Sequence, residues 1–94
     1  MLTAVKTALR VDGDELDTEV QDLIDAARLD LTLSGVAAAK ASDDTDPLIK
    51  RAIITYCRAN HDYADKSSER LQQSYDMLKA HLSMAEDYRA VVES

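Results

Sequence analysis

The sequence predicts an all-α fold: a small bundle of three to four helices followed by a flexible C-terminal tail. The chain of 94 residues holds only two glycines and one proline, so residues that break helices are scarce. Apolar residues recur at helical spacing in several stretches, and β-branched residues nowhere alternate with polar ones for long enough to indicate a strand. We therefore expect a single helical domain over residues 1–94, with residues 83–94 as a disordered tail.

Two helices are expected in the first third of the chain. Residues 2–10 form the first, with Thr3 as its N-cap, and Gly13 lies in the turn that follows. The second runs over residues 15–34, is capped by Asp14 and ends at Gly35. Its core-facing stripe consists of Leu16, Val20, Leu23, Ile24, Ala27 and Leu31.

A linker over residues 36–46 leads to the strongest helix signal, the dipeptide Asp46-Pro47. Asp is a favoured N-cap, and Pro at the first helical position gives up an amide that the helix does not use. The third helix is expected over residues 47–61. Apolar residues cover most of its circumference, which is typical of a central helix contacted from two directions. These residues are Leu48, Ile49, Ala52, Ile53, Ile54, Tyr56 and Cys57.

A fourth helix is expected to begin at Ser67 or Ser68, after a loop over residues 62–67. Its apolar residues are spaced by four, three and four positions: Leu71, Tyr75, Leu78 and Leu82. No cap marks residues 83–94, and we expect this segment to order only when it docks to a neighbouring molecule.

The net charge of −7 is concentrated in one half of the chain. Residues 1–46 hold 11 acidic and 4 basic side chains, whereas residues 47–94 hold 7 of each. DNA affinity depends on Lys and Arg that neutralise phosphates, so the acidic half should repel nucleic acid at long range. The single cysteine, the lack of a signal-peptide pattern and the absence of a long apolar run predict a protein made in the cytosol, with no membrane segment.

No enzymatic or metal-binding motif is apparent, and we expect neither catalysis nor a cofactor. An EF-hand loop starting at Asp12 would need Gly sixth and Glu twelfth, but Gly13 stands second and Leu23 twelfth. His61 and His81 lie too far apart for the usual paired spacing of zinc ligands. No nucleophile elbow, P-loop or dinucleotide-binding fingerprint occurs.

Two features indicate a surface for other protein molecules. The second helix carries an additional apolar strip of Ala26, Leu29 and Leu33, and its acids contrast with bases on the third and fourth helices. If the two sets lie on opposite flanks, copies can dock head-to-tail and close into a ring. The alternative is that the tail or the first helix covers the strip. The predicted subunit interface comprises Ala26, Leu29, Leu33, Lys50, Arg51, Arg58 and Arg70.

The whole chain resembles the head–tail connector family of long-tailed phages, also known as head-completion or DNA-packaging proteins. The resemblance is carried by TAVKTALRVDGDELDTEVQDLIDAAR at residues 3–28, DPLIKRAI at 46–53 and SSERLQQSYDMLKAHLSMAEDYR at 67–89. It implies a non-catalytic subunit that forms a ring below the portal protein, extends the DNA channel and offers a docking surface to tail-joining or stopper proteins. It also implies assembly in the host cytoplasm and a final place in the virion neck.

In such a ring, acids facing the channel would let DNA pass without sequence-specific binding, because carboxylates repel the phosphate backbone. The candidates are Asp22, Asp25 and Asp30. Two other functions remain open from the sequence. One is a dimeric regulatory module that pairs through the third helix. The other is a helix-turn-helix DNA-binding protein, although the stretch between the third and fourth helices is longer than the usual turn.

Overall fold

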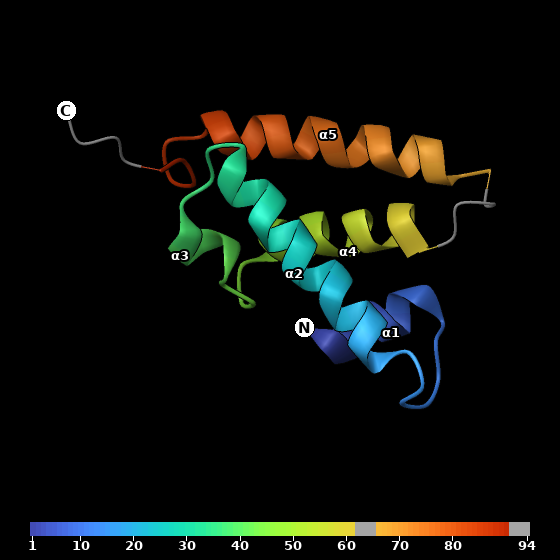
Figure 1. Cartoon of the computed structure of the whole chain (residues 1–94). Helices are drawn as coiled ribbons and strands as arrows, with labels where there is room; N and C mark the ends of the chain where they lie inside the picture. The colour runs from blue at the N-terminus through green and yellow to red at the C-terminus, as the bar shows by residue number, and fades with distance from the viewer. Residues whose placement is uncertain (62–65, 91–94) are drawn as a thin grey trace.

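The computed structural model describes residues 1–61 and 66–90, which fold into five helices (Figure 1). They are α1 (Leu2–Leu9), α2 (Asp17–Leu33), α3 (Ala38–Ala41), α4 (Pro47–His61) and α5 (Ser68–Met84). The predicted all-α class is confirmed. The count exceeds the predicted three to four because the alanine-rich start of the linker forms α3, a separate single turn, instead of extending α2.

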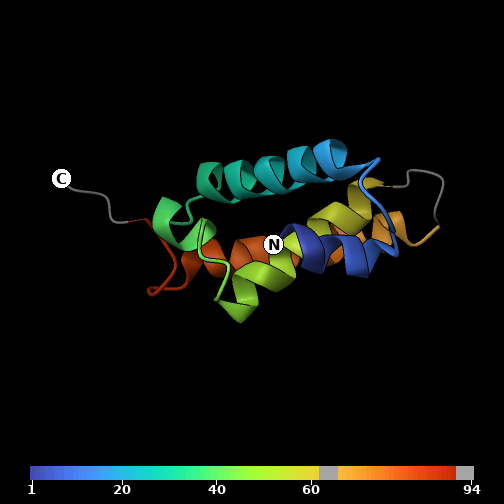
Figure 2. The same cartoon turned by 90° about the horizontal axis from the view of Figure 1, so that it is seen from below.

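The helices form two layers. Helices α1, α4 and α5 lie side by side with α4 in the middle, and α4 and α5 run antiparallel (Figure 1). Helix α2 crosses over α4 on one face of this layer, as the second view shows (Figure 2). The short α3 packs against α2.

Helix α4 is central, and its neighbours account for most of its apolar surface. It contacts α1, α2 and α5, and its side chains Ile49, Ala52, Ile53 and Cys57 are fully buried. The prediction that this helix is contacted from at least two directions is therefore confirmed. The apolar circumference of α4 is used mainly inside the domain.

The two strongest helix boundaries in the sequence have the expected geometry. The Asp46 Oδ1 atom accepts hydrogen bonds from the amides of Leu48 at 2.9 Å and Ile49 at 3.2 Å, as an N-cap does. At the end of α2, Gly35 has φ +111°, and the amide of Val36 donates to the carbonyl of Leu31 at 3.0 Å. This is the Schellman pattern, which satisfies the last carbonyls of a helix.

The predicted N-caps of the first two helices were wrong, and the second helix starts later than expected, whereas the first starts at Leu2 as predicted. Helix α1 has Met1, not Thr3, in the N-cap position, and α2 begins at Asp17 instead of residue 15. The N-cap position of α2 is held by Leu16, not Asp14, and the Asp14 carbonyl accepts from the Asp17 amide in the turn before the helix. Asp17 also forms an ion pair of 2.6 Å with Lys6, which ties the start of α2 to α1.

Part of the predicted tail contacts the domain. Ser83 and Met84 complete α5, and the backbone of the next residues pairs with the α2–α3 connection. The Ala37 amide donates to the Tyr88 carbonyl at 2.8 Å, and the Ala90 amide donates to the Gly35 carbonyl at 2.7 Å. Residues 91–94, the remainder of the predicted tail, lie outside the described residues.

Candidate functional site

One exposed helix face combines predicted interface residues with predicted channel acids. Asp22, Asp25, Leu29 and Leu33 follow one another by three or four positions along α2, so they lie on one side of it. The buried residues of α2 lie on the opposite side: Val20, Ile24, Ala27 and Leu31. We call the exposed side, defined by Asp22, Asp25, Leu29 and Leu33, the α2 outer face.

The apolar half of the α2 outer face is open to solvent. Leu29 is 59% exposed and Leu33 is 78% exposed, and Ala26 beside them is half-buried. Neither α1 nor residues 85–90 covers these leucines, and the rest of the tail named in that alternative lies outside the described residues. Two large apolar side chains exposed on one face are more consistent with a contact surface than a single exposed leucine would be.

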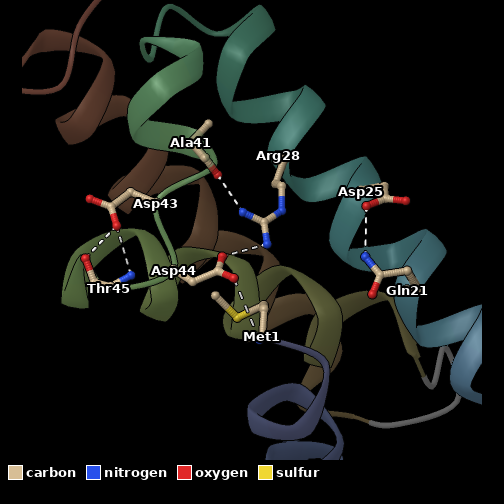
Figure 3. A network of polar contacts seen from close by, with 8 residues as sticks. All are labelled: Met1, Gln21, Asp25, Arg28, Ala41, Asp43, Asp44 and Thr45. Atoms are coloured by element: carbon tan, nitrogen blue, oxygen red, sulfur yellow. Dashed lines mark hydrogen bonds and ion pairs between the residues drawn. The ribbon is translucent and has the colours of Figure 1, made fainter.

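The acidic half carries uncompensated charge. Asp22 and Asp25 are exposed, and among the described residues neither forms an ion pair. Asp25 accepts a hydrogen bond of 3.0 Å from Gln21 one turn earlier (Figure 3). Like charges three residues apart on a helix repel each other by a few tenths of a kcal/mol, and a cation from outside would relieve that repulsion.

Asp30, the third predicted channel acid, has a different environment. It lies on the side of α2 near α5, where its Oδ2 atom accepts from the Tyr75 hydroxyl at 2.6 Å and from Lys79 Nζ at 3.1 Å. Its charge is therefore balanced within the domain by Lys79. The structure thus brings Asp22 and Asp25 together and separates Asp30 from both.

The predicted basic residues of the third helix line a groove. Two adjoining hollows run along the exposed side of α4 and between α4 and α5, and both are lined by Arg51, Thr55 and Arg58. We call the combined hollow the α4–α5 groove. Its remaining lining residues are Pro47, Lys50 and Ile54 on α4, with Leu71, Ser74, Met77 and Leu78 on α5.

The α4–α5 groove has a positive rim and an apolar floor. Lys50, Arg51 and Arg58 are exposed, and among the described residues they form no ion pair. Ile54 is half-buried between them. Uncompensated cations around apolar atoms form a surface suited to an acidic, partly apolar partner.

The contribution of α5 to the lining of this groove was not predicted from the sequence. Met77 is 75% exposed and lies outside the apolar stripe of Leu71, Tyr75, Leu78 and Leu82. The sequence signal that could have indicated this surface is an apolar side chain outside the core-facing stripe of its helix. Arg70, which was predicted to belong to the interface, is exposed on α5 but is not among the residues that line the groove.

The two surfaces lie on opposite sides of the domain. Helix α2 covers one face of α4 (Figure 2). The groove follows the exposed side of α4, which is opposite the buried side chains of that helix. Head-to-tail docking requires such opposite flanks, and Asp22 and Asp25 lie on the opposite flank from Lys50, Arg51 and Arg58.

A polar network holds α2 to the segment before α4. The Arg28 guanidinium donates to the Ala41 carbonyl at 3.2 Å and to Asp44 Oδ1 at 2.7 Å (Figure 3). Asp44 Oδ2 lies 3.8 Å from the N-terminal amine of Met1. Because Arg28 joins α2 to the residues that lead into α4, it helps to fix the position of the α2 outer face.

The described residues contain neither a metal-binding cluster nor a membrane-spanning helix. No group of three or more His, Cys, Asp or Glu side chains lies close enough to hold a metal ion. Within the same residues, no helix is long and apolar enough to cross a membrane. Cys57 is buried, and burial raises the pKa of its thiol to about 12.

A small helical domain with two opposed and chemically different surfaces has the features of an assembly subunit. The chain matches the model of the phage connector protein family over residues 1–89, and it belongs to that family. It is therefore a structural connector of a phage particle, a component of the virion neck that interacts with other head or tail proteins. No curated protein and no solved structure matches the chain.

Proposed function

We propose that the chain assembles as a ring of identical subunits below the portal protein, extends the DNA channel and provides a surface on which tail-joining or stopper proteins dock. Assembly takes place in the host cytoplasm during DNA packaging, and DNA passes through the ring without sequence-specific binding. The observation that carries this proposal is the pair of opposed surfaces on one domain, the α2 outer face and the α4–α5 groove.

Opposed surfaces favour a ring over a closed dimer. In a two-fold dimer the same patch of both molecules meets itself, so the α2 outer face would place Asp22 and Asp25 of one copy near those of the other. Contact between two different patches instead repeats from copy to copy and closes when the rotation allows. The separation of acids from bases in this domain supports the second arrangement.

The experiment is native mass spectrometry and negative-stain microscopy of the purified chain over a range of concentrations, alone and with its cognate portal. The proposal expects ring-shaped oligomers, free or attached to the portal. A species that stops at a dimer under both conditions would instead support the regulatory module considered from the sequence.

The acidic channel wall is a second proposal for the same ring. Asp22 and Asp25 retain uncompensated charge that would repel DNA phosphates, whereas the charge of Asp30 is balanced by Lys79. This proposal competes with a subunit contact, because Leu29 and Leu33 lie on the same face and would then be exposed to the water of the channel. Replacing Asp22 and Asp25 by Lys distinguishes the two: a wall residue would alter DNA release and leave the ring intact.

A further inference from the structure

We infer that the α2 outer face of one copy docks into the α4–α5 groove of the next copy. This inference rests on the proposed ring and deepens it, because it names the two surfaces that meet. The occupant of the groove is a second copy of this chain, and the contact places Asp22 and Asp25 against Lys50, Arg51 and Arg58.

The first reason is charge complementarity. Asp22 and Asp25 are exposed acids without an ion pair, and Lys50, Arg51 and Arg58 are exposed bases without one, among the residues that the structure describes. Other charged side chains of the domain do form internal pairs, such as Lys6 with Asp17 and Lys79 with Asp30. Asp22 and Asp25 form an acidic cluster on one side of the domain, and Lys50, Arg51 and Arg58 form a basic cluster on the other side.

The second reason is the match in polarity and length. Leu29 and Leu33 continue the acidic strip on α2, and Ile54 and Met77 provide apolar surface beside the bases of the groove. The strip from Asp22 to Leu33 and the α4 wall from Pro47 to Arg58 cover the same number of residues. Each is about 18 Å long at the helical rise of 1.5 Å per residue.

The third reason is geometric. A contact between two different surfaces on opposite sides leaves the same two surfaces available at the ends of every growing chain of subunits. The contact can therefore repeat until the ring closes. Leu29 and Leu33 lose exposure to water in this contact, and the charged pairs select the orientation of the incoming copy.

A charge-swap experiment tests the inference. One variant carries Asp22→Lys and Asp25→Lys, a second carries Lys50→Glu and Arg51→Glu, and a third carries all four changes. All four side chains are exposed, so each variant should keep the wild-type helical content and unfolding midpoint. Assembly is measured by native mass spectrometry and negative-stain microscopy, alone and on portal rings.

The expected results follow from the pairing of the two surfaces. Each two-residue variant alone should assemble at least tenfold more weakly than the wild type, because like charges meet at every contact. A mixture of these two variants should assemble, since every contact in an alternating ring again joins opposite charges. The four-residue variant should assemble with itself. The control carries Asp12→Lys and Glu15→Lys in the exposed turn before α2. It makes the same charge change as Asp22→Lys with Asp25→Lys and should assemble as the wild type does.

Each contrary outcome has a separate meaning. If wild-type rings form and the two-residue variants assemble equally well, the pairing is wrong while the ring stands. The pairing is also wrong, while the ring stands, if neither the mixture nor the four-residue variant restores assembly. If Asp22→Lys with Asp25→Lys leaves rings intact but retains DNA, the α2 outer face lines the channel and the pairing is overturned. Failure of the wild type to assemble, alone and on portal rings, overturns the proposed function itself.

Discussion

The hydroxyl of Tyr75 on α5 donates a hydrogen bond of 2.6 Å to the carboxylate of Asp30 on α2, 45 positions earlier in the chain. Lys79, one turn after Tyr75, forms an ion pair with the same oxygen at 3.1 Å and lies 5.3 Å from the centre of the Tyr75 ring. Both helices pack mainly against α4, so this cluster is a direct polar link between them. Burial, with the hydrogen bond to Asp30 as the second cause, raises the pKa of Tyr75.

Replacing Tyr75 by Phe should lower the free energy of unfolding by about 1–2 kcal/mol, because a hydrogen bond to a carboxylate is lost while the ring remains in place. The edge-to-face contact with Tyr56, whose ring centre lies 5.1 Å away, should survive. Urea unfolding followed by circular dichroism measures the change. Gln72→Ala, which removes an exposed hydrogen bond to Asp76 on the same helix, is the matched control and should cost less than about 0.5 kcal/mol. Equal stability of Tyr75→Phe and the wild type would show that the Asp30 contact contributes nothing.

Stability should decline as the pH rises above about 9, because the Cys57 thiol has a raised pKa in the folded state. Burial raises this pKa from 9.0 to about 12, so the unfolded chain loses a proton that the folded chain retains between these values. The free energy of unfolding should then fall by up to about 1.4 kcal/mol per pH unit. Urea titrations at several pH values between 8 and 10 test this. In Cys57→Ala the slope between pH 9 and 10 should be much shallower, and an unchanged slope would assign the effect to another group.

Replacing Asp46 by Ala should destabilise the domain by about 1–2 kcal/mol, since α4 loses its N-cap. The same carboxylate oxygen also accepts from the Tyr88 hydroxyl at 3.2 Å, and this hydrogen bond is the main cause of the raised pKa of Tyr88. Asp46→Asn keeps a capping oxygen and should recover most of the loss. Tyr88→Phe removes only the hydrogen bond from the C-terminal segment to Asp46 and should destabilise the domain less than Asp46→Ala does. If the Asn and Ala variants unfold at the same urea concentration, the cap is not the source of the stability.

Replacing Arg28 by Ala should release the segment between α3 and α4. The substitution removes hydrogen bonds to the Ala41 carbonyl and to Asp44, and we expect a loss of about 1 kcal/mol. Hydrogen exchange should accelerate at the amides of Ser42 and Asp43, while the amides in the middle of α4 keep their protection. Arg28→Lys, which retains the charge but not the two-pronged geometry, should fall between the wild type and the Ala variant. Uniform acceleration across the domain would contradict a local fastening role.

Two leucines near the end of α2 should respond differently to the same substitution. Leu31 is fully buried, so Leu31→Ala should cost about 2–5 kcal/mol through the cavity that it leaves. Leu33 is 78% exposed, so Leu33→Ala should change the stability of the monomer by less than about 0.5 kcal/mol. Thermal unfolding at low protein concentration, where subunits are separate, makes the comparison. A large loss from Leu33→Ala under these conditions would mean that it is packed within its own domain.

The sequence by itself determined the helical class and the strongest helix boundaries. Asp46-Pro47 marks the start of α4 because capping and proline effects act over one turn. Gly35 marks the end of α2 because a positive φ is readily adopted by glycine. The periodic stripes identified the core faces of α2 and α5, since the side of a helix on which a residue lies depends only on its position in the chain.

Only the tertiary structure decided how these helices share their surfaces. Asp22, Asp25 and Asp30 appear equivalent in the sequence, but Asp30 pairs with Lys79 of α5 while the other two remain exposed. The α4–α5 groove, including Met77, exists because α4 and α5 lie side by side, and the contact of residues 88–90 with residues 35–37 joins distant parts of the chain. Local periodicity carries no information about which helices become neighbours, because that choice depends on the packing of the whole core.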